Sequence, residues 1–293
     1  MTLQDPAWLD RVYNNRALVP DHADFLTRFA SESSRVRSTE VCTLDVPYGR
    51  GAREMLDIFP ATSIGKARTG APVLVFIHGG YWRSLDKSDH AFIAPSFTRE
   101  GVCVVMPNYP LCPGTSLQPV SIPDIALCLV RALEWTWRHA AEHGGDPARI
   151  TVAGHSAGGH LAAMLLACRW AVVGAGLPPD LVRNALSISG VHDLRSIQRT
   201  PFLSDSLRLT EADARRASPA LFKAPAGRTL VAVAGGDESE EFIRQARLIQ
   251  AAWGKPTVPI CDILPALHHF SVLDALTDPT NRLHQHASRL LDV

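Results

Sequence analysis

Short runs of continuous apolar and β-branched residues recur along this chain and alternate with segments of helical periodicity. The clearest runs are 72–80 (PVLVFIHGG) and 101–109 (GVCVVMPNY), and the clearest helical spacing covers 122–143 before Gly144-Gly145. Unbroken apolar runs of this length are typical of strands that are buried on both faces of a parallel sheet. Further strands are expected at 148–154, within 181–190, at 228–236 and at 258–264. The alternation predicts an α/β fold, with a mostly parallel twisted sheet and helices on both faces.

The segment before these runs has a different pattern. Residues 41–48 (VCTLDVPY) and 54–60 (EMLDIFP) alternate apolar and polar residues, with Gly49-Arg50-Gly51 between them. This pattern predicts antiparallel N-terminal strands at an edge of the sheet. A helix is predicted over 87–100, between the two buried strands.

The 293 residues contain no internal repeat and no Gly/Ser linker, so we expect one domain over 1–293. Residues 1–37 are polar and partly helical in character, and we expect an N-terminal arm or lid there. Residues 194–225 interrupt the alternation with short helical pieces and predict a small cap insertion.

Charge and hydropathy exclude several classes of protein. Lys plus Arg and Asp plus Glu each number 29, so the formal net charge is zero and nucleic-acid binding is disfavoured. No apolar stretch approaches the ~18 residues that a membrane-spanning helix needs. The first 20 residues contain no apolar segment of the kind found in signal sequences. We therefore expect a cytoplasmic protein without a membrane partner.

The most informative local motif is Gly154-His155-Ser156-Ala157-Gly158, between the strand ITVA and a helical segment. A G-x-S-x-G sequence in this context is typical of the nucleophile elbow, a sharp turn that exposes a serine at the edge of the sheet. The small residues on either side of the serine let the strand and the helix approach closely. We therefore expect Ser156 to be a catalytic nucleophile.

A serine nucleophile needs a base and an acid that orients the base. With the order serine, acid, histidine, the acid is expected just after a strand, and Asp237 follows the strand within 228–236. The alternative for Asp237 is a helix N-cap. Its acidic neighbours, Glu238 among them, are expected to lie in the first turn of the following helix, where they match its dipole.

Among the 12 histidines, only His268 and His269 follow a late strand through a short loop and precede a helix. Adjacent side chains cannot both face the serine, and we choose His269 as the base, with His268 as the alternative. The oxyanion donors are expected to be the N–H groups of Gly79 and Gly80, which follow a buried strand, and of Ala157.

Other catalytic motifs are missing from the sequence. There is no HExxH, no GxxxxGK[ST] and no GxGxxG, and the six cysteines include no CxxC pair. We therefore expect no cofactor and no metal.

Together these segments resemble the α/β-hydrolase fold and, more narrowly, the kynurenine formamidase (arylformamidase) and related esterase group. The resemblance lies in a series of motifs between residues 78 and 270. They are HGGYW at 78–82, NYPLCP at 108–113 with Ser116-Leu117, GHSAGGHLAAMLL at 154–166, GDESEEFIRQARL at 236–248 and His269-Phe270, with YNNR at 13–16 also similar to bacterial members.

The resemblance implies the same catalytic set, Ser156, Asp237 and His269. It further implies that Tyr81 and Trp82 contribute to the wall of the substrate pocket, to which His155 would also belong. The segment at 190–194 (GVHDL) departs from the family, because His192 stands where relatives often have tyrosine. This departure affects the predicted shape of the pocket.

We therefore expect a serine hydrolase that cleaves a small-molecule ester or amide through an acyl-enzyme. An arylformamidase acting on an N-formylkynurenine-type substrate is the first hypothesis, and a carboxylesterase for short-chain or aryl esters is the alternative. A ligand-binding protein that keeps the hydrolase fold without turnover is a remote third. The sequence leaves a homodimer open.

Overall fold

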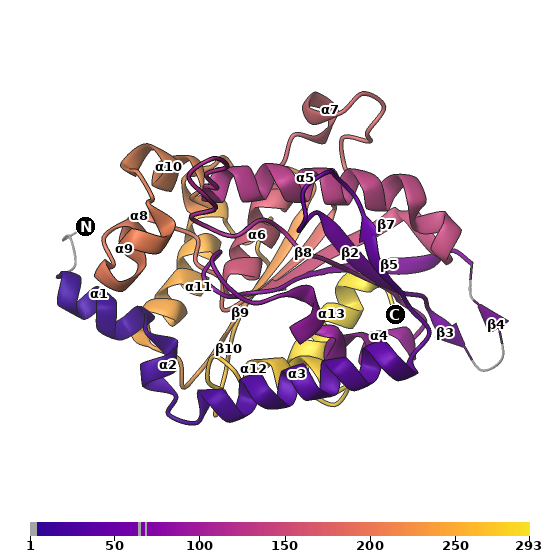
Figure 1. Cartoon of the computed structure of the whole chain (residues 1–293), viewed down its shortest axis with the longest axis horizontal. Helices are drawn as coiled ribbons and strands as arrows, with labels where there is room; N and C mark the ends of the chain where they lie inside the picture. The colour runs from indigo at the N-terminus through magenta and orange to yellow at the C-terminus, as the bar shows by residue number, and fades with distance from the viewer. Residues whose placement is uncertain (1–4, 64–65, 68) are drawn as a thin grey trace.

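The chain forms one eight-stranded mixed sheet with helices on both faces (Figure 1). The computed structural model describes residues 5–63, 66–67 and 69–293. In the order in which they lie in the sheet, the strands are β1 (Thr43–Pro47), β2 (Met55–Phe59), β6 (Cys103–Pro107), β5 (Ala71–Ile77), β7 (Gly145–His155), β8 (Asn184–Ile188), β9 (Thr229–Gly235) and β10 (Ile260–Leu264). A separate two-stranded ribbon pairs β3 (Thr62–Ser63) with β4 (Lys66–Ala67).

The directions of the strands confirm the predicted fold class. β1 and β2 pair antiparallel, and β2 is antiparallel to β6. All neighbouring pairs from β6 to β10 are parallel. The parallel strands therefore direct their carboxyl ends to one edge of the sheet, where α/β enzymes place their ligands.

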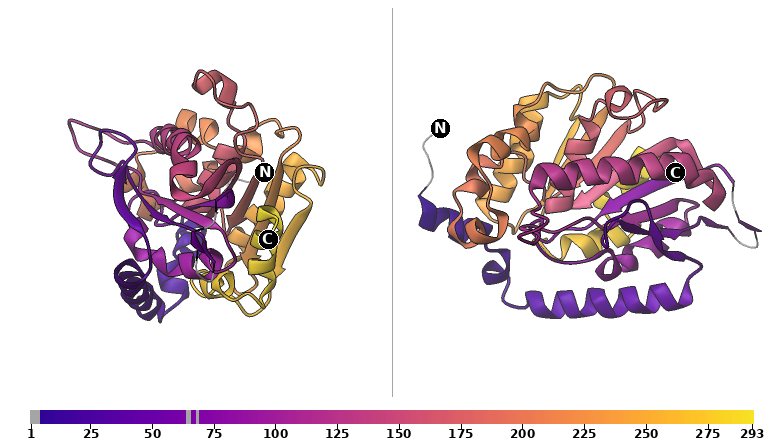
Figure 2. Two further views of the ribbon diagram at one scale, coloured as in Figure 1. Left: turned by 90° about the vertical axis from the view of Figure 1, so that its right-hand side faces the viewer. Right: turned by 45° about the horizontal axis from the view of Figure 1, so that its top comes forward.

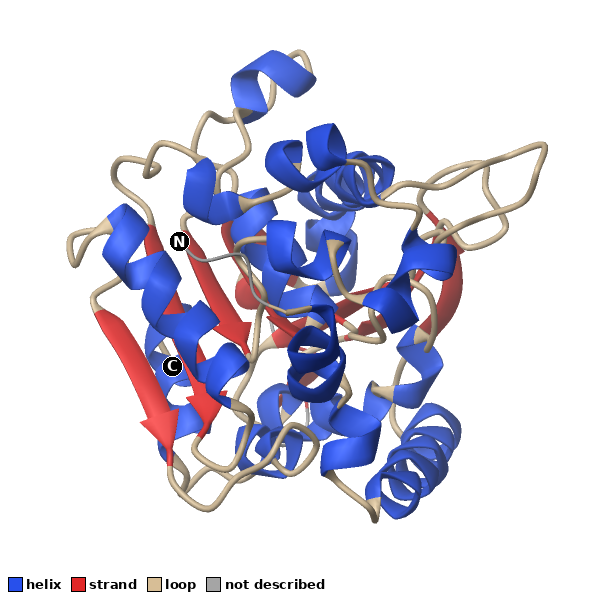
Figure 3. Cartoon of the chain, turned by 90° about the vertical axis from the view of Figure 1, so that its left-hand side faces the viewer, coloured by secondary structure: helices blue, strands red, loops and turns tan. Residues whose placement is uncertain are grey.

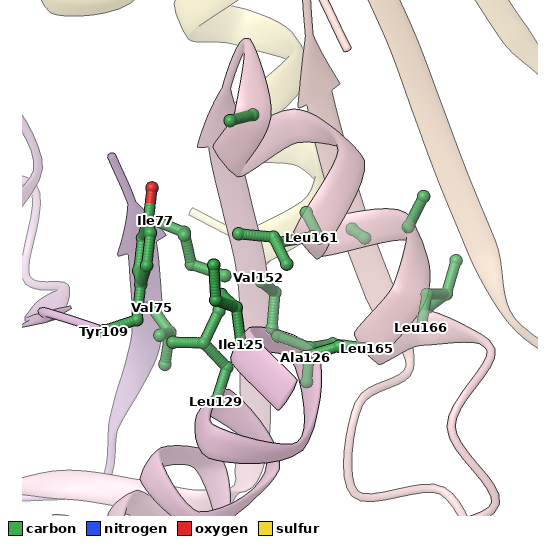
Figure 4. Close-up of a cluster of buried hydrophobic side chains, with 14 of the residues drawn as sticks. Val75, Ile77, Tyr109, Ile125, Ala126, Leu129, Val152, Leu161, Leu165 and Leu166 are labelled. Atoms are coloured by element: carbon green, nitrogen blue, oxygen red, sulfur yellow. The ribbon is translucent and has the colours of Figure 1, made fainter. Parts of the chain in front are cut away.

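The central strands are buried on both faces because alternate side chains enter two different cores. In β5, Val75 and Ile77 pack against α5 (Ile122–His139) and α6 (Ala157–Leu166), as Figure 4 shows. Leu74 and Phe76 instead enter the core on the opposite face. Both faces of these strands thus need apolar residues, which accounts for the unbroken runs in the sequence.

The remaining helices divide between these two layers (Figures 1 and 2). α11 (Glu240–Trp253) shares the core of α5 and α6. The opposite face is covered by α3 (His22–Thr39), α4 (Ala94–Thr98), α12 (Val272–Thr277) and α13 (Arg282–Leu291). None of the helices in the described ranges is both long and apolar enough to cross a membrane.

Two predicted helices differ in detail from the structure. The helix expected over 87–100 is two 3-10 turns, η1 (Lys87–Asp89) and η2 (Ala91–Ile93), followed by α4. A capping box between Asp86 and Asp89 closes the first turn, and α4 begins with a proline in its first turn, where the missing N–H costs least. The helix expected over 122–143 ends at His139 and continues as the 3-10 turn η3 (Ala140–His143).

The N-terminal segment before α3 and the residues between β8 and β9 lie side by side near the carboxyl edge of the sheet, on the left-hand side of Figure 1. Figure 3 views the molecule from this side. The first forms α1 (Pro6–Tyr13) and α2 (Asn15–Leu18) before α3, and the second forms α8 (Arg195–Gln198), α9 (Pro201–Leu207), α10 (Glu211–Arg216) and the 3-10 turn η4 (Pro219–Leu221). The Phe202 N–H donates to the Asp10 carboxylate across them at 3.0 Å. A short helix, α7 (Trp170–Val173), projects beyond α5 at the top of Figure 1.

Candidate active site

Ser156 lies in the turn that joins β7 to α6. Its backbone has φ 57° and ψ −116°, a region that residues other than glycine rarely occupy. The conformation is held by the surrounding structure, because the Ser156 N–H donates to the Ile188 carbonyl of β8 at 2.8 Å. This strained strand-to-helix turn is the geometry expected of a nucleophile elbow.

Close backbone approach explains the two glycines of the motif. A Cβ on Gly154 would lie 2.3 Å from the backbone of Gly158, and a Cβ on Gly158 would lie 2.0 Å from the Ile77 carbonyl oxygen. Neither contact leaves room for a side chain. The G-x-S-x-G spacing therefore follows from the packing of α6 against β5 and β7.

His269 lies in the loop between β10 and α12, where its ring is buried. Nδ1 donates to Oε2 of Glu238 at 2.7 Å. A carboxylate can only accept, so this bond places the proton on Nδ1 and leaves the Nε2 lone pair free. His269 and Ser156 line the same cavity. The imidazole thus has the tautomer that a general base for a serine hydroxyl requires.

The Glu238 carboxylate is held by two further donors. The Ser189 hydroxyl donates to Oε1 at 2.5 Å, and the Gly235 N–H donates to the same oxygen at 2.7 Å. One carboxylate oxygen is thereby fixed by the ends of β8 and β9, and the other faces the imidazole. Buried carboxylates need partners of this kind for their lone pairs.

The expectation that Asp237 orients the histidine is corrected by this geometry. The chain turns tightly after β9, with the Glu238 N–H donating to the Gly235 carbonyl at 3.3 Å. This turn brings residue 238 back over the end of the strand and leaves Asp237 exposed. The Asp237 N–H donates to the Leu267 carbonyl, so its backbone ties the two loops together. The sequence Gly235-Gly236-Asp237-Glu238 places two acids after a glycine turn, so it also indicates Glu238 as a candidate for the catalytic acid.

His268 has a different position from His269. Its Nδ1 accepts from the N–H groups of Phe270 and Ser271, each at 3.2 Å, just before α12 begins. Its ring packs edge-on against Phe25 of α3, with 4.9 Å between the ring centroids. Of the two adjacent histidines, His269 is the one that the structure brings to Glu238.

The three predicted oxyanion donors lie on two segments, the loop after β5 and the start of α6. A Cβ on Gly79 would lie 3.2 Å from the Cβ of Ser156, so this backbone passes directly beside the nucleophile. Gly80 has φ 103°, which glycine adopts without strain. Ala157 is the first residue of α6. Within the described residues, the N–H groups of Gly79, Gly80 and Ala157 donate to no other group.

A cavity of about 330 Å³ opens in front of Ser156. Its wall is built from the elbow, the 80–85 loop, the N-terminal helices and α9. Of the predicted pocket residues, Tyr81 and His155 line it, together with Gly80. The aromatic and polar groups from the N-terminal helices and α9 were not predicted as site residues: they are Asn14, Asn15, Arg16, Phe29 and Phe202.

Trp82 and His192, predicted as pocket residues, lie elsewhere. Trp82 is fully buried and its indole N–H donates to Nδ1 of His160 at 3.2 Å. His192 is also buried, with Nε2 3.3 Å from the Ser187 hydroxyl. Both side chains belong to the core beneath the site, so this part of the prediction is wrong.

His155 supports the loop that carries the base. Its Nε2–H donates to the His269 carbonyl at 2.8 Å, and the two ring centroids are 4.6 Å apart. Burial, followed by the neighbouring charges of His269 and His90, holds the pKa of His155 well below its usual range. A neutral His155 therefore lies next to His269 and adds no positive charge there.

Three other histidines are fully buried around the elbow. Burial lowers the pKa of His78 to about 3, with His90 adding to the effect. Burial lowers the pKa of His160 to about 4, and burial together with the charge of His160 lowers that of His192 to about 3. Within the described ranges, no group of three or more histidine, cysteine, aspartate or glutamate side chains is arranged to hold a metal ion.

These shifts predict a loss of stability in mild acid. Above pH ~6.5 the three imidazoles are mostly neutral in both the folded and the unfolded protein. Below this pH the imidazoles of the unfolded protein take up protons, whereas those of the folded protein stay neutral until the pH reaches their lowered pKa values. Each histidine should cost about 2 kcal/mol of unfolding free energy between pH 7 and pH 5. Urea unfolding at the two pH values measures the loss in wild type and in His192→Gln, which removes one titrating group.

The loss between pH 7 and pH 5 should be about 2 kcal/mol smaller in His192→Gln. Carboxylates titrate equally in both proteins, so the comparison cancels them. His143→Gln, at a less buried position, is the matched control. An equal loss in His192→Gln and wild type would contradict the prediction.

The chain is similar to known hydrolases in sequence and in structure. The BD-FAE family model matches residues 56–170. A kynurenine formamidase of Salmo salar is 28% identical over 269 residues, which cover 89% of this chain and 85% of that protein. The esterase LipQ of Mycobacterium tuberculosis is 35% identical over 194 residues, 62% of this chain and 44% of that protein.

A solved structure from Silicibacter sp. TM1040, provisionally assigned as a thioesterase, superimposes with a TM-score of 0.78. It is 30% identical, and the match covers 94% of this chain and 97% of that one. The fold, the elbow and these relatives agree with the resemblance that the motifs carry. The chain is therefore a hydrolase that belongs to the α/β-hydrolase superfamily, in its group of kynurenine formamidase-like esterases.

Proposed function

We propose that this protein cleaves a small amide or ester through an acyl-enzyme formed on Ser156. His269 is the base in this proposal, and Glu238 orients it. The observation that carries the proposal is the 2.7 Å bond from Nδ1 of His269 to the buried Glu238 carboxylate, in the same cavity as a serine on a strained elbow. A protein that only binds ligands has no need for this combination.

In the first half-reaction the Ser156 oxygen attacks the substrate carbonyl while Nε2 of His269 takes the hydroxyl proton. The carbonyl π electrons move to its oxygen, which accepts from the N–H groups of Gly79, Gly80 and Ala157. The intermediate collapses, the bond to the leaving group breaks, and His269 donates its proton to the departing amine or alcohol.

Water completes the reaction. Nε2 of His269 takes a proton from water as the water oxygen attacks the acyl-enzyme carbonyl, and the same three N–H groups hold the second oxyanion. Collapse returns the proton to the Ser156 oxygen and releases the carboxylic acid. The Glu238 side chain stabilises the imidazolium that forms in each half-reaction.

For the substrate we propose an aryl formamide of the N-formylkynurenine type. The named activity of the Salmo salar relative supports this choice, as do the aromatic side chains of Phe29, Phe202 and Phe270 in the cavity wall. The volume of about 330 Å³ is near the lower end of the range for small-molecule sites, which favours a substrate with one aromatic ring.

A carboxylesterase for short-chain or aryl esters is the second candidate. It is supported by the esterase relative, whose match covers 62% of this chain. The same catalytic groups serve both reactions, because only the leaving atom differs. The homodimer and the cytoplasmic location stay predictions from the sequence.

The proposal predicts that a fluorophosphonate probe labels wild type and that the label is absent from Ser156→Ala. Only an activated serine attacks such a phosphorus centre. Ser84→Ala is the matched control, because Ser84 also lines the cavity but its hydroxyl donates to the Gly80 carbonyl. Equal labelling of Ser156→Ala and wild type would contradict the proposal.

Steady-state kcat/KM then separates the two substrate classes. Wild type is compared on N-formylkynurenine and p-nitrophenyl acetate, with Ser156→Ala as the blank for each. Preference for the formamide supports the arylformamidase, and fast ester cleavage with little formamide turnover supports the esterase.

A further inference from the structure

Two arginines line the cavity without any acidic side chain beside them. Arg83 comes from the loop after the oxyanion glycines, and Arg16 comes from α2. Among the described residues that line the cavity, none is an aspartate or a glutamate. The wall of the cavity thus carries two positive charges that the rest of the wall does not neutralise.

Neutral groups hold the Arg83 guanidinium in place. Its Nη1 donates to the Ser206 hydroxyl at 2.6 Å and to the Phe202 carbonyl at 3.3 Å, both in α9. Its cation lies over the Phe202 ring, 5.6 Å from the centroid. Across the described chain, Arg83 forms no ion pair. A fixed guanidinium with unused N–H donors matches a carboxylate well.

Arg16 belongs to a short segment that is tied to the rest of the site. The Tyr13 hydroxyl donates to Glu241 at 2.6 Å, and the Tyr81 hydroxyl donates to the Tyr13 carbonyl. The Asn14 side chain accepts from the Ala17 N–H and so caps α2. These bonds fix the backbone that carries Arg16 against the cavity. No ion pair to Arg16 is found in the described residues either.

The two charges act on each other. Burial, followed by the charge of Arg16, lowers the pKa of Arg83. Two like charges at one cavity repel, and an anion placed between them relieves that repulsion and gains two attractions. A neutral substrate would gain neither.

We propose that Arg16 and Arg83 form an anion subsite that binds a carboxylate on the substrate, in the part of the molecule remote from the scissile bond. The subsite rests on the proposed function, because it shares the cavity of Ser156. It assigns the substrate to the class of aryl amides or esters that carry a carboxylate. The segment 13–16, which the catalytic machinery does not use, thereby acquires a function in specificity.

The test compares two substrates that differ only in this charge. They are N-formylkynurenine and its derivative in which the carboxylate is a primary carboxamide. Both transfer the same formyl group to Ser156, and water then releases it as formic acid. The quantity measured is the ratio of their kcat/KM values, which does not depend on the fraction of active enzyme in a preparation. Wild type is expected to prefer the carboxylate.

In Arg83→Gln the ratio should fall about tenfold or more, the size expected for a charge-assisted hydrogen bond in a partly buried site. Arg16→Gln should lower it about threefold, because Arg16 is exposed and solvent screens its charge. The double variant should show the largest loss. Arg35→Gln is the matched control, since Arg35 is an exposed arginine of α3 that does not line the cavity. An unchanged ratio in the double variant would overturn the subsite.

Failure of the proposed function would give a different result. In that case wild type hydrolyses neither compound, and calorimetric binding of kynurenine and of its carboxamide replaces the kinetic ratio. Tighter binding of the carboxylate, lost in the double variant, supports the subsite. Equal binding of the two compounds to wild type overturns it.

Discussion

Replacement of His269 by alanine is expected to lower kcat/KM by about 10⁴- to 10⁶-fold on any substrate of this cavity. The imidazole is the group whose Nε2 is free to take the Ser156 proton, because Nδ1 is committed to Glu238. Without it the hydroxyl stays protonated at neutral pH, and the leaving group finds no proton donor. Steady-state rates at pH 7.5 measure the loss.

His268→Ala is the control within the same loop. Its ring packs on Phe25 and its Nδ1 accepts from two backbone N–H groups, so its loss should cost stability more than rate. We expect less than a tenfold change in kcat/KM at a temperature where the variant is folded, as judged by circular dichroism. A larger loss in His268→Ala than in His269→Ala would reverse the assignment.

The parts of the fold that the sequence predicts well are those set by local pattern. β5 and β6 read as unbroken apolar runs because both of their faces are buried. Ser156 could be found because the elbow requires glycine at 154 and 158, where a Cβ would lie 2.3 Å or less from backbone atoms. Such steric requirements restrict which residue types can occupy a position, so the sequence indicates them directly.

The direction of a side chain is not set by the local sequence, and the incorrect pocket predictions concern this direction. Trp82 follows the oxyanion glycines, yet its indole reaches into the core to His160. His192 follows β8 near the site and is instead buried beside Ser187. Both residues lie close to the site along the sequence, but tertiary packing decides which way they face.

The contribution of the N-terminal segment to the cavity wall depends on contacts between residues that are far apart in the sequence. The Tyr13 hydroxyl reaches Glu241 across 228 residues, and this contact helps fix α1 and α2 beside the cavity. The periodicity of apolar residues in the sequence does not indicate such a contact. The sequence therefore predicted an arm or lid but not that Asn14, Asn15 and Arg16 would line the cavity.

Tertiary packing also decides between the adjacent acids Asp237 and Glu238, because only Glu238 reaches Nδ1 of His269. Glu238→Gln should lower kcat by about 10³- to 10⁴-fold. The side-chain oxygen of the amide will stay with its two donors, the Ser189 hydroxyl and the Gly235 N–H. Its NH₂ group then faces Nδ1 of His269 and stabilises the tautomer with the proton on Nε2. That tautomer cannot accept the proton of Ser156.

Asp237→Asn is the matched control, with the same loss of one charge at an exposed position. Its backbone bond to Leu267 is unaffected, so kcat should stay within about twofold of wild type. Glutamine is close in size to glutamate, so the two variants should differ little in folding, which urea unfolding checks. If Asp237→Asn loses the activity and Glu238→Gln keeps it, the imidazole is oriented by Asp237 in solution and the turn after β9 differs from the one described.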